Sequence, residues 1–288
     1  MTGSNVHLLA DIGGTNARFA MSKGDGAITD VQVLPVADFA RFEDALASYV
    51  AQSNRVVANV VIAAAGPVID GCIRMTNADW KISSEAVQSI CGSVQVHILN
   101  DLEAVALSLP ALRKTDLRTL HEGCKPATQA PLLCVNIGTG FGAAVALFSH
   151  NRWHTLSTEA GHMPLALQSS KDQLMLKSGV HVEDVLSGPG LAELRQSHGD
   201  GTQLKRFFSS TMGCVAGDLI LATGSWGGLY LCGGVLQSID QVVEINCFLE
   251  SLHNRKGLAG SLQSVPVHHI TCPNPAYTGM QQLLSLPR

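Results

Sequence analysis

Residues 6 to 22 read Val6-His-Leu-Leu-Ala-Asp-Ile-Gly-Gly-Thr-Asn-Ala-Arg-Phe-Ala-Met-Ser22, and the architecture of the chain can be worked out from them. Val6 to Ala10 is a short apolar run of the length expected for a buried strand. A glycine turn follows at residues 13–16. Beyond it, Phe19 and Met21 alternate with Arg18 and Ala20, which is the period of a second strand. The motif is therefore a strand–turn–strand hairpin.

The glycine turn is suited to a phosphate group. Dinucleotide-binding and Walker loops run from a strand into a helix, whereas this turn joins two strands. Gly13 and Gly14 let the backbone approach a bulky anion, and turn N–H groups can line a phosphate. Thr15 and Asn16 add a hydroxyl and an amide, and Asp11 can hold a magnesium ion through water. A plain Gly-Gly hairpin is the alternative, but it leaves the carboxylate and both donors unexplained.

Composition sets the class of protein. The chain has 288 residues, 46% hydrophobic and 15% charged, which is enough for a sizeable core in one large domain or two ordinary ones. A net charge of −4 without a basic run disfavours nucleic acid and anionic membranes as partners. We find no signal peptide before the first strand and no apolar run of membrane-spanning length. The eight cysteines show no Cys-x-x-Cys spacing, so we expect a reduced cytoplasmic protein without structural zinc.

A second strand–glycine–strand unit appears later in the chain. Residues 132–137 predict a strand, Gly138-Thr-Gly-Phe-Gly142 a glycine turn, and residues 143–148 another strand. Two such hairpins suggest a duplicated architecture in which one phosphate group is held from each side. Further strands are predicted at 31–34, 56–65, 94–99, 229–232 and 266–271, and helices at 39–52, 84–91, 102–109, 203–222, 239–253 and 276–284. Residues 113–130 are polar and mixed, and we expect a surface connection there.

Asn100 and Asp101 stand where the strand at 94–99 meets the next helix. One interpretation is that either residue is simply the helix N-cap. The other is that Asp101 points into a cleft as a catalytic base, kept ionised by the helix N-terminus. Spacing alone does not choose between them.

Several polar or glycine-rich stretches in the second half are candidates for ligand binding. Glu159 and His162 have a metal-binding spacing only if they lie on a helix, which Gly161 and Pro164 disfavour. In a loop both side chains can bind sugar hydroxyls, and a solvated loop is the alternative. Glu183 is the polar candidate of the turn at 182–190. The Gly233-Gly234 pair after a strand suits the flat face of a base or its ribose.

Taken together, these stretches resemble the bacterial glucokinases of the hexokinase-type, actin-like ATPase superfamily. The resemblance runs through nearly the whole chain in the family's order. The matching stretches are Asp11–Arg18, Met75–Trp80, Leu99–Asp101, Gly138–Gly142, Glu159–His162, Glu183–Leu191, Gly227-Gly228, Gly233-Gly234 and Asn274-Pro275.

The resemblance implies an α/β fold of the actin-like ATPase (ribonuclease H-like) type, with two α/β domains flanking a cleft. The small N-terminal domain would comprise residues 1–108 plus 274–288, and the large domain residues 109–273. The last helix would return to pack on the N-terminal domain.

The resemblance also implies a function, the ATP-dependent phosphorylation of glucose at its 6-hydroxyl. Asp101 matches the family's catalytic base. The sugar-binding positions match Asn100, Asp101, Glu159, His162 and Glu183. The nucleotide-binding positions are expected at Asp11, Gly13, Gly14, Thr15, Asn16, Gly138, Thr139, Gly140, Gly233 and Gly234. Magnesium would be held by Asp11 through water. Glucose and ATP are then the partners in the cytoplasm, without nucleic acid or membrane, and a homodimer is left open.

The chain departs from the family in two places. The stretch between Leu191 and Gly227 is shorter than usual, which bears on nucleotide affinity and oligomer contacts, and Ala160 replaces a glycine. Three alternatives to a glucokinase remain: a kinase for fructose or mannose, a non-catalytic sugar-binding homologue, and a sugar-responsive regulator. The regulator is disfavoured, because no room precedes Val6 for a helix-turn-helix and the cysteine-rich zinc motif is missing.

Overall fold

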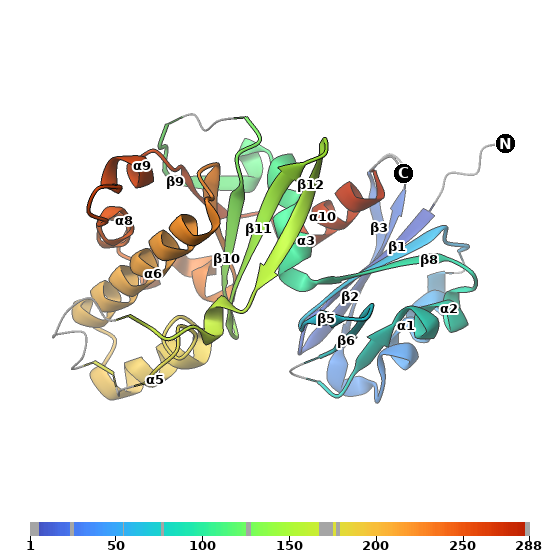
Figure 1. Cartoon of the computed structure of the whole chain (residues 1–288). Coiled ribbons are helices and arrows are strands. Elements are labelled where there is room, and N and C mark those ends of the chain that lie inside the picture. Colours follow the sequence, from blue (N-terminus) through green and yellow to red (C-terminus); the bar gives the residue numbers. More distant parts are fainter. Residues whose placement is uncertain are drawn as a thin grey trace. The chain divides into compact units, whose positions relative to one another are not determined.

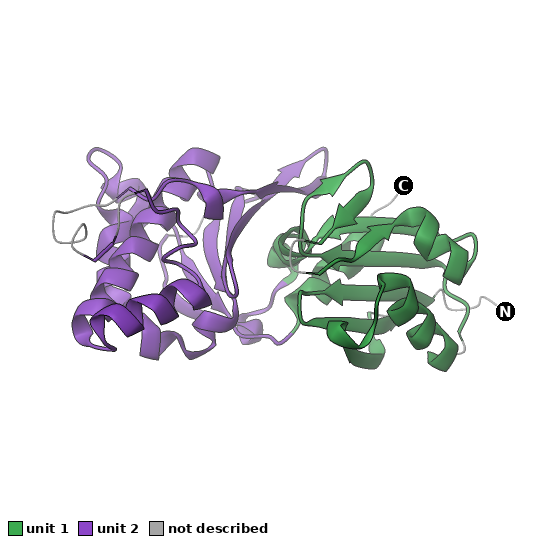
Figure 2. Cartoon of the chain, turned by 90° about the horizontal axis from the view of Figure 1, so that it is seen from below, with its two compact units in different colours: residues 1–111, 274–288 green, residues 112–273 purple. Residues whose placement is uncertain are grey.

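A computed structural model of the chain describes residues 6–23, 26–53, 55–75, 78–124, 128–166, 175–176 and 179–285. The chain divides into two compact units, which Figure 2 shows in different colours. Unit 1 comprises Met1–Ala111 and Asn274–Arg288, and unit 2 comprises Leu112–Pro273. Residues 76–77 of the matching stretch Met75–Trp80 lie outside the described residues, as do residues 286–288.

Unit 1 is built on a five-stranded sheet with the strand order β3-β2-β1-β4-β8 (Figure 1). Its strands are β1 (Val6–Ile12), β2 (Asn16–Lys23), β3 (Ile28–Pro35), β4 (Asn59–Ala64) and β8 (Gln95–Asn100). The first three are antiparallel neighbours, whereas β4 and β8 continue the sheet in parallel with β1. The predicted opening hairpin is therefore confirmed. A small separate sheet contains β5 (Val68–Ile69), β6 (Cys72–Arg74) and β7 (Lys81–Ser83).

Helices cover both faces of this sheet. They are α1 (Phe42–Ser53), α2 (Ser84–Cys91), α3 (Asp101–Ser108) and α10 (Pro275–Leu284). Successive strand residues point to opposite faces, so Leu8 of β1 packs in the core with α1 while Leu9 packs against α3 and α10. Trp80 is buried in the first of these cores and donates from Nε1 to the Phe39 carbonyl at 3.2 Å, so it is a packing residue. The last helix thus packs on the N-terminal part of the chain, as the resemblance implies.

Unit 2 is built on a six-stranded sheet with the order β12-β11-β10-β13-β14-β9. Its strands are β9 (Leu117–His121), β10 (Leu132–Ile137), β11 (Phe141–Ser149), β12 (Arg152–Thr158), β13 (Gly228–Cys232) and β14 (Val267–Ile270). Its helices are α5 (Gly188–His198), α6 (Thr202–Thr223), α7 (Ile239–Val242), α8 (Ile245–His253) and α9 (Ala259–Gln263). One large core joins β10 and β13 to α6 and α8. None of the helices in the described ranges combines the length and apolar character needed to cross a membrane.

The two sheets repeat one topology. In each, a first strand pairs antiparallel with the second, the second antiparallel with the third, and two parallel strands follow on the other side. The hairpin β1–β2 in unit 1 therefore corresponds to β10–β11 in unit 2. This equivalence confirms the duplicated architecture that the two glycine turns predicted.

Two predicted elements are wrong in detail. Residues 113–130 contain strand β9, which pairs antiparallel with β14 at the edge of the sheet and is tied to it by a hydrogen bond between Thr119 Oγ1 and His268 Nδ1 at 3.1 Å. The single helix expected at 239–253 is two helices, α7 and α8, separated by the extended residue Val243. The break is fixed by Ser209 of α6, whose hydroxyl accepts the Glu244 N–H at 2.8 Å.

Candidate active site

The first glycine turn is a tight connection between β1 and β2. Its residues are the predicted nucleotide-binding Gly13, Gly14, Thr15 and Asn16. The Gly13 N–H donates to the Asn16 carbonyl at 2.9 Å, and the Thr15 carbonyl accepts the Val36 N–H at 2.9 Å. The turn is thus closed internally and fixed to the chain that follows β3.

Asp11 lies inside β1 rather than after its end, because the strand continues to Ile12. Its direct neighbour on β2 is Arg18, whose Nη1 is 3.4 Å from Asp11 Oδ2. Burial raises the pKa of Asp11, while the Arg18 charge and its hydrogen bond oppose that rise. The carboxylate of Asp11, partly neutralised by Arg18, therefore lies two residues before the first glycine turn.

Asn100 is the N-cap of α3, which settles which of the two neighbours caps the helix. Its Oδ1 accepts the N–H groups of Leu102 at 3.0 Å and Glu103 at 3.3 Å, and Glu103 Oε2 accepts the Asn100 N–H at 3.1 Å. This reciprocal pair is a capping box. Asn100 Nδ2 also donates to the Gly66 carbonyl at 3.2 Å. Asn100 therefore holds the end of β8 and the start of α3 together.

Asp101 is the first residue of α3, and its Oδ1 accepts the Leu102 N–H at 2.9 Å. Burial raises the pKa of Asp101 to about 6, and the nearby charge of Asp11 adds to the rise. We expected the helix N-terminus to favour the ionised carboxylate, and with a pKa of about 6 Asp101 is still mostly ionised at neutral pH. The backbone hydrogen bonds do favour the charged form, but desolvation and a second carboxylate outweigh them.

Glu159, His162 and Glu183 gather at one place in unit 2. Residues Ala160–His162 form a 3-10 turn directly after β12, so Glu159 and His162 do not lie on an α-helix. His162 Nδ1 lies 3.6 Å from Glu159 Oε2, and His162 Nε2 lies 3.6 Å from Glu183 Oε1. The side chains of Glu159 and His162 are 75% and 70% exposed, whereas that of Glu183 is 36% exposed. Three polar side chains from two distant stretches thus lie together with polar atoms exposed to solvent.

Glu183 also connects this cluster to the second glycine turn. Its Oε2 accepts the Phe141 N–H at 3.3 Å, directly after the turn at 138–140. A Cβ at Gly140 would approach Glu183 Oε2 to 2.9 Å, so Gly140 leaves room for that carboxylate. Gly140 therefore shapes the turn around Glu183.

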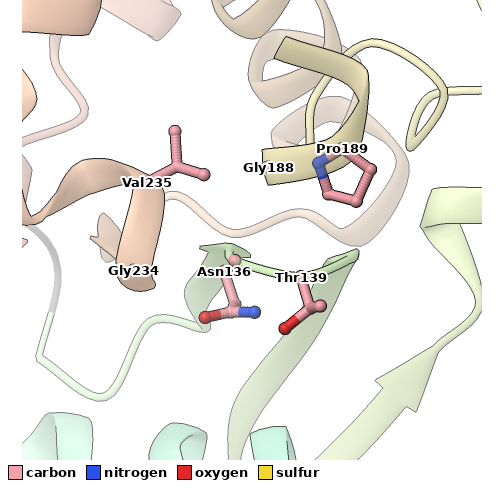
Figure 3. A pocket seen from close by; sticks show the side chains of 7 residues that line it. Asn136, Thr139, Gly188, Pro189, Gly234 and Val235 are labelled. Atoms are coloured by element: carbon pink, nitrogen blue, oxygen red, sulfur yellow. The ribbon is translucent and has the colours of Figure 1, made fainter. Parts of the chain in front are cut away.

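A pocket of about 480 Å³ opens beside the second glycine turn (Figure 3). It is lined by Asn136, Gly138, Thr139, Gly188, Pro189, Gly234 and Val235. Three of these, Gly138, Thr139 and Gly234, were predicted nucleotide-binding residues, and the structure brings them together from the turn after β10 and from the segment after β13. The turn is held to the start of α5 by the Gly188 N–H, which donates to the Gly138 carbonyl at 2.7 Å.

Gly233 is predicted to bind the nucleotide, but it does not line this pocket. Its φ is +109°, and a Cβ there would come within 2.3 Å of the Ile137 carbonyl oxygen. Only glycine fits such a conformation and approach. Gly233 therefore lets the end of β13 pass close to the end of β10, and so helps to form the pocket.

Asn136 is the pocket residue that sequence analysis missed most clearly. It stands two residues before Gly138, as Asp11 stands two residues before Gly13, so the two occupy equivalent places in the repeated hairpins. Its Oδ1 accepts from Cys232 Sγ at 3.7 Å. A lone amide in the otherwise apolar strand Leu132–Ile137 was the signal that could have identified it. Gly188, Pro189 and Val235 were also missed as pocket residues.

The described ranges hold no group of three or more His, Cys, Asp or Glu side chains arranged to bind a metal ion. A divalent cation in this part of the chain would thus keep most of its ligands as water or substrate oxygens, which is how Mg²⁺ is commonly bound.

Two sheets with one repeated topology, each beginning with a hairpin closed by a glycine turn, define the actin-like ATPase fold. Within that fold class the chain belongs to the glucokinase family. The sequence model of the family described as Glucokinase matches residues 8–205 and 195–286. The predicted fold class and the predicted family are both confirmed.

Named relatives agree with this assignment. The glucokinase of Caulobacter vibrioides is 30% identical over 310 residues, which cover 94% of this chain and 93% of that protein. A "Bifunctional protein glk" of Burkholderia orbicola is 31% identical over 312 residues, which cover 96% of this chain and 48% of that protein. The chain therefore spans about half the length of the bifunctional relatives that it matches. The crystal structure of a glucokinase from an Antarctic psychrotroph superposes with a TM-score of 0.83 at 27% identity and covers 97% of this chain and 98% of that one.

Proposed function

We propose that this chain is a glucokinase that transfers the γ-phosphoryl group of ATP to the 6-hydroxyl of glucose. The observation that carries this proposal is a phosphate-type glycine turn at the same place in each unit, accompanied in unit 1 by the carboxylate of Asp101 at the start of a helix. Membership of the glucokinase family and the name of the Caulobacter relative support it.

The nucleotide is assigned to the pocket of unit 2. Gly138, Thr139 and Gly234 would contact its phosphates and ribose, with Gly140 and Gly233 shaping the walls. The backbone N–H groups of Gly13 and Gly14 and the side chains of Thr15 and Asn16 would serve the phosphates from unit 1.

A divalent cation fits the residues present in unit 1. Asp11 and Asp101 are close enough for the charge of Asp11 to raise the pKa of Asp101, and the ion pair with Arg18 opposes only part of the negative charge. Asp11 would hold magnesium through water. The bound ion would supply charge neutralisation for the phosphates.

Asp101 is the proposed general base. It would accept the proton of the 6-hydroxyl as that oxygen forms its bond to the γ-phosphorus, and the bond from phosphorus to the bridging oxygen would break to leave ADP. Asn100, Glu159, His162 and Glu183 would bind the other hydroxyls. Asn100 uses one Nδ2 hydrogen on Gly66 in the described part of the chain, which leaves its second hydrogen for a hydroxyl oxygen.

Three further assignments follow from the proposed activity. The two compact units would act as the two domains of the kinase. The reaction would be the first step of glycolysis and would take place in the cytoplasm. A homodimer stays a prediction.

The test is steady-state phosphorylation by the purified chain, with Mg·ATP and a panel of glucose, fructose and mannose, followed as ADP release. We expect the highest kcat/KM for glucose. A preference for another hexose would make the chain a kinase for that sugar. Sugar binding without ADP release for any of them would make it a non-catalytic homologue.

A further inference from the structure

Two cysteine thiols lie next to each other in the sheet of unit 2. Cys134 is on β10 and Cys232 ends β13, the two central strands of that sheet, which run parallel. Their Sγ atoms are 3.8 Å apart, and the two residues are 0% and 9% exposed. The proposed reaction uses neither thiol. Paired cysteine sulfurs are ligands that soft and borderline metal ions prefer.

The register of the sheet places both thiols and the amide of Asn136 on one face. Cys134 pairs with Tyr230, and Asn136 pairs with Cys232. Directly paired residues share a face of the sheet, and so do residues two positions apart on one strand. Cys232 Sγ lies 3.7 Å from Asn136 Oδ1. Two sulfur atoms and an amide oxygen therefore gather where β10 and β13 end.

The pocket beside the second glycine turn opens next to this group. Asn136 is only half-buried and lines that pocket (Figure 3). Two glycines lie against its amide. A Cβ at Gly138 would lie 3.5 Å from Asn136 Nδ2, and a Cβ at Gly233 would approach Asn136 Oδ1 to 2.7 Å. Because neither residue carries a side chain, the amide stays uncovered, and a small ion can reach the neighbouring Cys232 from the pocket.

The offset between the two cysteines favours a bridging ion over a disulfide. Cys134 and Cys232 stand on neighbouring strands but two positions apart in the register. Such diagonal neighbours have Cα atoms roughly 7–8 Å apart. A disulfide joins cysteines whose Cα atoms lie within about 7 Å, so it would require the strands to move. An atom placed between the sulfurs requires no such movement.

The observed distances match a tetrahedral zinc ion. With Zn–S bonds of about 2.3 Å and a Zn–O bond of about 2.1 Å, a tetrahedral site separates two sulfurs by about 3.8 Å and a sulfur from an oxygen by about 3.6 Å. The separations here are 3.8 Å between the two thiols and 3.7 Å between Cys232 Sγ and Asn136 Oδ1. The ligand atoms are thus already spaced for the ion.

We propose that Cys134, Cys232 and Asn136 bind a thiophilic divalent cation such as Zn²⁺ through two thiolates and one amide oxygen, with water in the fourth position. Binding releases the two thiol protons and forms two metal–sulfur bonds, so no oxidant or reductant takes part. The open fourth position distinguishes the site from a structural zinc site closed by four side chains. The site is also smaller than the groups of three or more His, Cys, Asp or Glu side chains that the described ranges lack.

Titration with Co²⁺ tests the proposal, because cobalt can replace zinc and its bonds to thiolates absorb light. The reduced, metal-free chain is titrated without nucleotide or sugar. We expect one equivalent of Co²⁺ to give thiolate-to-cobalt charge-transfer absorption and the visible bands of a tetrahedral ion. Cys134→Ser and Cys232→Ser should each lower the affinity by more than about 100-fold, since losing even an outer-shell partner costs roughly 10- to 100-fold. Cys124→Ser, which changes an exposed cysteine of the same unit, is the matched control and should bind like wild type.

X-ray absorption of the wild-type chain loaded with one equivalent of Zn²⁺ gives a test that does not depend on the folding of any variant. We expect two sulfur ligands at about 2.3 Å and two oxygen ligands at about 2.0–2.2 Å. Any number of sulfur ligands other than two would overturn the proposal, and so would wild-type affinity for Co²⁺ in either serine variant of the pair. Because these measurements follow metal binding alone, a chain that binds the ion but phosphorylates no sugar would refute the proposed function and not this inference.

Discussion

Replacing Asp101 by asparagine should make the protein more stable at neutral pH and nearly inactive. Asparagine keeps the shape of the side chain and the Oδ1 that accepts the Leu102 N–H at 2.9 Å. It removes the proton acceptor, which contributes about 10²–10⁴-fold to turnover when it acts as a general base. Glucose affinity should stay close to that of wild type.

The gain in stability can be worked out from the pKa of Asp101, which burial and Asp11 raise from 3.8 to about 6. Each pKa unit corresponds to about 1.4 kcal/mol, so the ionised carboxylate disfavours the folded state by roughly 3 kcal/mol above pH 6. Asp101 is partly exposed, and its charge interacts favourably with the helix N-terminus, so we expect the variant to recover about 1–2 kcal/mol.

Proton binding gives this difference a pH signature. Because the folded-state pKa of Asp101 lies above its unfolded value, the stability from the bound proton is complete below about pH 4 and is lost as the pH rises through about 6. The variant and wild type should therefore be equally stable near pH 4, and the variant more stable at pH 7.5. The turnover of wild type should fall as the pH falls through about 6, because a protonated Asp101 cannot accept the hydroxyl proton.

Urea unfolding at pH 4.5, 6 and 7.5 without nucleotide and with a chelator measures the difference, using the buried Trp80 of unit 1 as a fluorescent reporter. Asp44→Asn is a matched control, since Asp44 lies in the first turn of α1 and Arg41 lowers its pKa instead of raising it. Asp44→Asn should not gain stability at any of these pH values. An Asp101→Asn variant that is no more stable than wild type at pH 7.5, or that differs equally at pH 4.5, would refute the reasoning, and near-wild-type turnover would exclude Asp101 as the base.

Three further substitutions test the rest of the site. Gly13→Val should fold, since a Cβ there meets only the Asn16 carbonyl oxygen at 3.5 Å. In binding titrations its affinity for ATP should fall far more than its affinity for glucose, and equal losses of the two affinities would point to misfolding. Glu183→Gln should raise KM for glucose about 10-fold with a smaller change in kcat, because it removes a charge from the cluster with His162; an unchanged KM in steady-state assays would take Glu183 out of the sugar site. Asn136→Asp should lower the affinity for AMPPNP at least about 10-fold in calorimetry, because it places a carboxylate beside the negatively charged phosphates. An unchanged affinity would place the phosphates elsewhere.

Features that depend on local sequence were predicted well. The two hairpins and β4 rest on short apolar runs, α1 and α6 rest on apolar residues at helical spacing, and their ends are set by nearby glycine or polar residues. Gly224 ends α6, for example, in the left-handed conformation that glycine favours.

Features that depend on distant contacts were missed. Strand β9 has no apolar alternation of its own and exists because β14, about 150 residues later, offers an edge to pair with. The break between α7 and α8 depends on Ser209 of α6. The raised pKa of Asp101 depends on burial and on Asp11, ninety positions earlier in the chain. A window of neighbouring residues contains none of this information.

The two glycine hairpins also differ in one polar residue, and this difference bears on the roles proposed for them. The hairpins occupy equivalent places in the two sheets, but the polar residue two positions before each turn is Asp11 in unit 1 and Asn136 in unit 2. A carboxylate can hold a hydrated cation, yet it would repel a phosphate placed directly against it. An amide brings no charge and offers N–H donors to a phosphate oxygen. The change from a carboxylate to an amide at this position therefore agrees with the proposed cation at Asp11 in unit 1 and with the proposed nucleotide phosphates in the pocket of unit 2. Neither hairpin alone would indicate this division of roles.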